Sequence, residues 1–133
     1  MTRIELDDAQ LARVQDEGRR IALQLSTAPA WRPGEGADTR PVPGHLSGIA
    51  LVFEDATATF DGGVAPGDCI GAVREARLQH DGQLVRDLPV PAEWTGAITL
   101  ELTLRNGVGL QVRAQRMCAR RADDSRFTES LAC

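Results

Sequence analysis

The side chains best suited to metal chemistry lie in predicted loops of the sequence. Imidazole and carboxylate groups together suit a divalent first-row metal. The candidate ligands are His45, Asp61, Asp68 and His80. Neither histidine stands two or four residues from another good ligand, so a metal site forms only if the fold gathers these groups. The simpler alternative is two exposed histidines, one after a Pro/Gly-rich loop and one in a turn.

The cysteines give little support to nucleophilic chemistry. There are three of them and no CxxC pair, which in a reducing compartment predicts free thiols. Cys69 lies at a predicted turn-to-strand transition, but the carboxylate of Asp68 beside it should raise the thiol pKa and oppose activation. We expect Cys69 to be a small buried residue and Cys118 to lie in or near the core. The terminal Cys133 would be an oxidation risk rather than a catalyst.

Common catalytic motifs are absent from the sequence. It contains no GxSxG nucleophile, no HExxH metal motif and no phosphate-binding Gly-rich loop. Glu54 and Asp55 are adjacent carboxylates, but neighbours in a strand face opposite ways and should not share a site. The second acidic pair, Asp123-Asp124, is typical of a turn. Acid/base chemistry of the glycosidase kind is therefore not predicted.

Trp31 and Trp94 are the candidate binding residues. Both lie beside prolines, in the segments APAWRPG and PAEWTG. Paired tryptophans at loop ends can stack on a sugar or a peptide, whereas their commoner role is to seal the ends of a small β core. Besides these two, the chain has three phenylalanines and no tyrosine, which are too few aromatic residues to line a ligand cavity.

Strands must position all of these residues, and the clearest strand pattern lies in residues 97–116. Apolar and polar residues alternate there on both sides of an Asn-Gly pair. A two-residue loop would put polar side chains on the apolar face, and a one-residue slip flips every side chain. A loop over 105–107 instead pairs Leu104 with Val108 and keeps the apolar face intact. The sequence therefore predicts a hairpin with Gly107 left-handed in a bulge.

Other segments predict further strands. Residues 75–91 predict a second hairpin that turns at 80–82, and residues 48–60 are rich in β-formers and end at a Gly-containing turn. Residues 8–25 fit either a helix opened by a capping box or two strands, and we favour strands because apolar residues alternate from 21 to 25. Residues 33–44, with three prolines and three glycines, predict a mobile surface loop. The tail predicts a last short strand or helical turn.

Together these patterns predict one all-β domain over residues 1–133. The expected fold is an antiparallel β-sandwich or small barrel of about six to eight short strands, with a short N-terminal helix as an alternative. The net charge is −4, and all 15 basic residues are scattered arginines, which disfavours nucleic acid and anionic membranes as partners. No signal peptide or apolar membrane span is apparent, so we expect a cytoplasmic protein.

The absence of catalytic motifs favours a non-catalytic binding or protein-interaction module that needs no cofactor. We expect it to associate with a second copy of itself or with another protein. The interface should lie at an edge strand or at the loops of Trp31 and Trp94. The alternative is a small metal-dependent enzyme or ligand carrier that uses the four loop histidines and aspartates.

Overall fold

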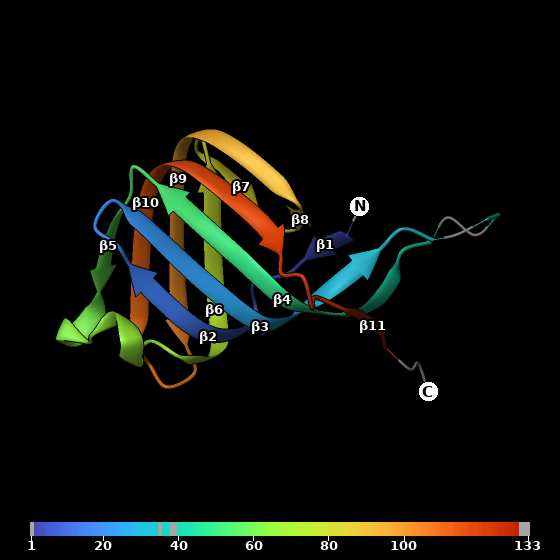
Figure 1. The fold of residues 1–133 in the computed structure, drawn as a ribbon, viewed down its shortest axis with the longest axis horizontal. Helices are drawn as coiled ribbons and strands as arrows, with labels where there is room; N and C mark the ends of the chain where they lie inside the picture. Colours follow the sequence, from blue (N-terminus) through green and yellow to red (C-terminus); the bar gives the residue numbers. More distant parts are fainter. Residues whose placement is uncertain (1, 35, 38–39, 131–133) are drawn as a thin grey trace.

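The computed structural model describes residues 2–34, 36–37 and 40–130, and these residues form an all-β fold. Six long strands close an antiparallel barrel in the order β2-β3-β4-β10-β9-β6, and β6 pairs back on β2 (Figure 1). Their bounds are β2 Gln10–Asp16, β3 Arg20–Arg32, β4 Val42–Glu54, β6 Gly71–His80, β9 Ala92–Leu104 and β10 Gly109–Arg121. The all-β prediction is confirmed, and the closed ring of strands decides for a barrel over a sandwich.

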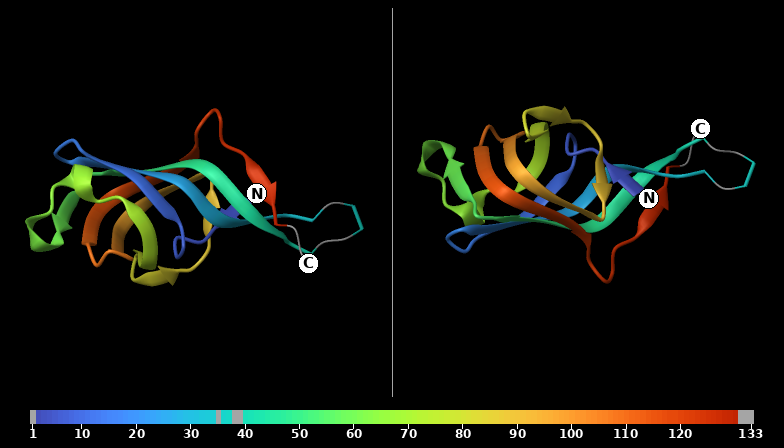
Figure 2. Two further views of the ribbon diagram at one scale, coloured as in Figure 1. Left: turned by 90° about the horizontal axis from the view of Figure 1, so that it is seen from below. Right: turned by 90° about the horizontal axis from the view of Figure 1, so that it is seen from above.

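An arm extends from one end of the barrel. Residues 28–32 of β3 and 42–46 of β4 continue past the barrel as a two-stranded ribbon, which we call the arm (Figure 2). Short strands flank it: β1 pairs with β3 and with β8 on one side, and β11 pairs with β4 on the other. Their bounds are β1 Thr2–Ile4, β8 Leu88–Val90 and β11 Phe127–Glu129. The arm is thus the centre of a small sheet in the order β8-β1-β3-β4-β11.

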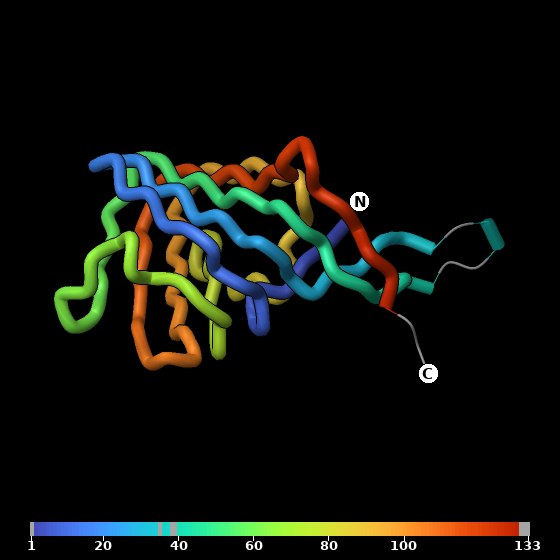
Figure 3. Tube along the Cα trace, turned by 60° about the horizontal axis from the view of Figure 1, so that its bottom comes forward, coloured from blue at the N-terminus to red at the C-terminus, as the bar shows by residue number. Residues whose placement is uncertain are grey.

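The remaining elements complete the barrel wall and its other end. β5 (Thr57–Phe60) follows β4 along β10, and β7 (Gln83–Val85) returns along β6. Between β5 and β6, the 3₁₀ turns η1 (Asp61–Gly63) and η2 (Pro66–Asp68) cross the end of the barrel opposite the arm (Figure 3). No described segment forms a helix long and apolar enough to cross a membrane.

The β9–β10 hairpin has the predicted register. Leu102 pairs with Leu110, and the main-chain N–H of Leu104 donates to the carbonyl of Val108 at 2.8 Å. Gly107 adopts a φ of 91°, which an L side chain rarely adopts. The three-residue loop is therefore confirmed, because only this register keeps the leucines of both strands in the core.

The second predicted hairpin is also present, with a tighter turn. β6 and β7 pair around Asp81 and Gly82, whose φ angles are 50° and 79°. Two consecutive positive φ values are typical of a type I′ turn. His80 is therefore the last residue of β6, not a turn residue as predicted.

The N-terminal segment forms strands, so the helix alternative for residues 8–25 is wrong. β2 and β3 pair around a turn in which Gly18 has a φ of 77°. Ile21, Leu23 and Leu25 are buried in the core, as their alternation predicts. Long-range burial of this face outweighs the capping-box signal.

The Pro/Gly-rich loop is shorter than predicted, because residues 42–44 already belong to β4. Gly44 allows β11 to pair closely with this part of β4, because a Cβ at that position would collide with the ring of Phe127 and the carbonyl of Thr128. The predicted mobility of the loop falls partly on residues 35, 38 and 39, outside the described residues. The predicted last short strand is present as β11.

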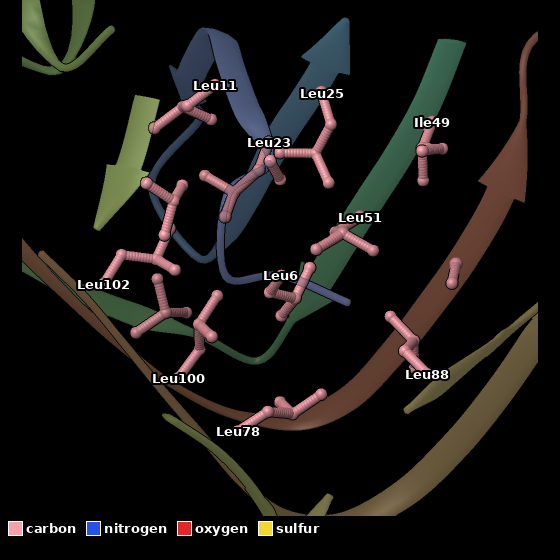
Figure 4. Packing of buried hydrophobic residues seen from close by; sticks show 14 of the residues in the cluster. Leu6, Leu11, Leu23, Leu25, Ile49, Leu51, Leu78, Leu88, Leu100 and Leu102 are labelled. Carbon is pink, nitrogen blue, oxygen red and sulfur yellow. The ribbon is translucent and has the colours of Figure 1, made fainter. Parts of the chain in front are cut away.

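Aliphatic side chains fill the inside of the barrel. Leucines from β3 and β4 meet leucines from β6 and β9 across the interior (Figure 4). Phe53 has the largest of the fully buried side chains, and no polar or charged residue among those described is classed as buried. The barrel interior is therefore a packed core, as expected for a six-stranded barrel, and candidate sites must lie on its outside.

Candidate functional site

The structure does not gather the four predicted metal ligands. His45 is exposed on the arm, opposite Pro29 and Thr128. Asp61 and Asp68 lie in η1 and η2 at the other end of the barrel, and His80 ends β6. Within the described residues, no group of three or more His, Cys, Asp or Glu is arranged to hold a metal ion. The metal-dependent alternative has no geometric support here.

The two described thiols have different surroundings. Cys69 is fully buried, and its burial raises the thiol pKa, with a further increase from Asp68, as the sequence predicts. Cys118 is half-buried and lies between the core residues Met117 and Ala119, so its side chain faces the outer wall. The expectation was a position in or near the core, and Cys118 lies next to core residues without belonging to the core itself. Cys133 lies outside the described residues.

Trp94 is built into the barrel wall. Its ring stacks on His80 with 4.9 Å between ring centroids and an interplanar angle of 5°. His80 Nε2 lies 2.7 Å from the carbonyl oxygen of Thr95, which only accepts hydrogen bonds, so this nitrogen carries the proton. Trp94 also packs against the hydrophobic core. This is the sealing role, with one face of the indole covered by the imidazole.

A groove runs beside Trp94 on the outer wall of β4, β9 and β10. Its volume is about 450 Å³, and its lining mixes apolar and charged residues. We call it the Trp94 groove; it includes Glu93, Trp94, Cys118 and Arg120. Glu93 and Cys118 are cross-strand partners.

At the rim of this groove, Glu54 and Asp55 converge, contrary to prediction. Arg116 Nη2 lies 3.5 Å from a carboxylate oxygen of each. The cause is local: β4 ends at Glu54, and Asp55 adopts a φ of 50°, so the strand alternation stops there. All three side chains are about half exposed, and exposed ion pairs contribute little to stability. Asp55 also lies 3.7 Å from Nη2 of Arg19, so the two carboxylates pair with two arginines.

Trp31 lies in a different setting, on the outer face of the arm's small sheet. It is the cross-strand partner of Arg3, which in turn partners Pro89. Ile4, the chain neighbour of Arg3, and Ala30, the chain neighbour of Trp31, are buried in the core on the other face of the sheet. Within the described residues, Trp31 neither packs against the core nor stacks with another ring. Both indoles are half-buried, but of the two only Trp94 has a ring stacked on it and packs against the core.

A cleft of about 450 Å³ opens beside Trp31, and most of its lining is apolar. We call it the Trp31 cleft; it is formed by Arg3, Glu5, Trp31, Arg32, Pro33, Pro41 and Asp87. The prolines come from the two ends of the loop that joins β3 to β4. Their rings and the indole provide rigid apolar surface at low entropic cost.

Two carboxylates stand on the wall of this cleft. β1 and β8 pair Ile4 with Leu88, so continuing the register by one residue sets Glu5 opposite Asp87. Burial raises the pKa of Glu5, and the carboxylates of Asp7, Asp87 and Asp8 raise it further. In the part of the chain that the structure describes, neither Glu5 nor Asp87 has a salt bridge. Negative charge on this wall is therefore incompletely neutralised.

Sequence reasoning found Trp31 but missed the acidic wall beside it. At the start of the chain the buried residues Ile4 and Leu6 alternate with Arg3 and Glu5, and this short alternation predicts one outer face for the two charged residues. No local signal could have placed Asp87 opposite Glu5, because they are joined only through the pairing of two three-residue strands.

The two cavities share no lining residue, so the tryptophans do not form one surface. In the Trp94 groove the thiol of Cys118 lies across from the carboxylate of Glu93. Within the described residues neither cavity holds a set of metal ligands. Comparison with family models, with curated proteins and with solved structures found no match.

Proposed function

We propose that this protein is a non-catalytic binding module in which the barrel holds the Trp31 cleft rigidly for a segment of a partner protein. We place it in the cytoplasm, as the sequence suggests. The net charge of −4 supports a protein partner over a nucleic acid.

One observation carries the proposal: Trp31 lines an open, mostly apolar cleft and is not used by the core. A central apolar surface with a charged rim is the usual anatomy of a protein interface. Tryptophan is enriched among the residues that dominate binding energy. The rim of the cleft carries both signs of charge. Arg3 is the cross-strand partner of Trp31, and the carboxylates of Glu5 and Asp87 lie in the next row of the sheet.

Rigidity of the site supports the same function. Trp31 is held by pairing on both sides, to Arg3 in β1 and to Pro43 in β4. The face behind it is core, where Ala30 is 1% exposed. A preorganised site loses little conformational entropy when a partner binds.

A selection from a phage-displayed library of random peptides tests this function. We expect wild-type protein to enrich peptides that also bind Trp94→Phe but fail to bind Trp31→Ala. Trp94→Phe is the matched control because it alters the other tryptophan and retains a ring against His80. If the enriched peptides bind Trp31→Ala equally well, or if nothing is enriched and Trp31→Ala dissociates no dimer, the proposal is wrong.

Sedimentation velocity identifies the other form of partner, a second copy of the chain. A dimer that Trp31→Ala dissociates supports binding through the cleft between two copies. A dimer that persists in Trp31→Ala, together with failure of the peptide selection, would instead place the interface elsewhere and contradict the cleft as the site.

A further inference from the structure

We propose that the Trp31 cleft recognises an arginine side chain of the partner segment, stacked on the indole and paired with Glu5 and Asp87. The inference rests on the proposed function and adds to it the chemistry of the bound group.

The positions of the three residues fit a single long side chain. Trp31, Arg3 and Pro89 form one row of cross-strand partners over β3, β1 and β8. The next row contains Pro29, Glu5 and Asp87, since the N–H of Glu5 donates to the carbonyl of Pro29 at 2.9 Å. Glu5 is therefore a diagonal neighbour of Trp31 on the adjacent strand, at a typical spacing of about 7 Å, and Asp87 lies one strand farther, opposite Glu5. The indole and the carboxylates thus line adjacent parts of one cleft.

The cleft lining holds two arginines, Arg3 and Arg32, as well as the two carboxylates, and Arg32 is paired with Glu129. Glu5 faces three neighbouring carboxylates, and of these Asp8 is paired with Arg105 at 2.9 Å. Arg3 reaches the main-chain carbonyl of Asp87 at 3.4 Å rather than its carboxylate. Two carboxylates set opposite each other without a cation are destabilising, and a bound cation would relieve that repulsion.

The lining of the cleft, with an indole, two carboxylates and mostly apolar surface, favours guanidinium over ammonium. Guanidinium is planar, stacks on aromatic faces and presents a fork of donors that matches carboxylates. Its weak hydration lowers the cost of entering a mostly apolar cleft. Arg32 shows this preference within the chain itself: its guanidinium carbon lies 5.2 Å from the ring centre of Phe127 while it pairs with Glu129.

Synthetic versions of the selected peptides test the inference by calorimetric titration. We expect the peptides to share an arginine, and its replacement by citrulline, a neutral isostere, to weaken binding by about tenfold or more. Replacement by lysine should weaken binding by less. The double variant Glu5→Gln/Asp87→Asn should bind the arginine peptide about as weakly as wild type binds the citrulline peptide. Glu93→Gln, a charge change in the Trp94 groove, is the control and should leave the affinity unchanged.

The outcomes separate the two proposals. Peptides that need Trp31 but tolerate citrulline would overturn the arginine inference and leave the binding function standing. If no peptide depends on Trp31 and Trp31→Ala dissociates no dimer, both proposals fail. Should the double variant not fold, the citrulline comparison on wild-type protein still decides the question.

Discussion

The chain has two tryptophans, and the fold uses them in opposite ways. Trp94 packs on the core and lies flat against His80. Trp31 lies on the outer face of the arm, beside an open cleft and a pair of carboxylates. Their sequence surroundings are alike, since each has prolines nearby.

The difference shows that the neighbours across the sheet decide the role of an aromatic residue. Trp94 acquires a partner from β6 because the tight Asp81-Gly82 turn leaves His80 at the end of that strand. Trp31 instead lies next to the short strands β1 and β8, whose outward residues are charged or proline. One indole therefore packs into the barrel, and the other is the one that we propose for binding.

The largest expected effect comes from removing each indole in turn. Trp94→Ala should lower the free energy of unfolding by about 3 kcal/mol, because it leaves a cavity against the core. Trp31→Ala should change it by about 1 kcal/mol or less, as is usual for residues outside the core. Denaturant unfolding measures both values. Equal decreases in the free energy of unfolding for the two variants would contradict the different roles assigned to the two indoles.

A smaller effect is expected at the partner of Trp94. His80→Ala removes the ring stack and the hydrogen bond to Thr95, which together contribute about 1–2 kcal/mol. In a Trp31→Phe background the fluorescence of Trp94 should also shift to the red as its covered face meets water. His45→Ala on the exposed surface of the arm is the matched control and should be nearly neutral. If His80→Ala is equally neutral, the stack does not hold Trp94.

The smallest effect concerns the acidic wall of the Trp31 cleft. Because the folded protein raises the pKa of Glu5 above its ordinary 4.5, the folded state holds that proton more tightly than the unfolded chain. The free energy of unfolding must then fall as the pH rises from the ordinary pKa of Glu5 through its raised pKa in the folded protein. Ionised Glu5 therefore disfavours folding at neutral pH. Glu5→Gln should raise the melting temperature slightly at neutral pH and give no gain well below pH 4.5.

Glu93→Gln makes the same charge change beside Trp94 and serves as the control for this measurement. The variants are compared by thermal melts at both pH values. A gain for Glu5→Gln that is the same at neutral and acidic pH would contradict the proposed repulsion on the cleft wall.

The sequence predicts the fold well where the pattern is local. The register of β9 and β10 follows from the alternation of apolar and polar residues around the Asn-Gly pair. The burial of Ile21, Leu23 and Leu25 follows from the same kind of alternation in β3. Closure into a barrel does not follow, because it depends on the short pairing of β2 with β6, at residues 10–11 and 71–72.

The sites are harder to predict because they depend on contacts between distant residues. Trp31 and Trp94 could be chosen as candidates from residue type, but the sequence could not show which of them packs on the core and which lies beside an open cleft. That distinction depends on His80 for one and on Glu5 and Asp87 for the other. Convergence of carboxylates on Arg116 was missed because the left-handed Asp55 interrupts the alternation.

The two indole N–H signals in the NMR spectrum test the central claim most directly. Each tryptophan gives one signal, which single Trp→Phe variants assign, and a selected arginine peptide is then titrated in. The Trp31 signal should move to saturation while the Trp94 signal stays in place. A shift of the Trp94 signal alone, or of neither, would contradict the division of roles between the two tryptophans.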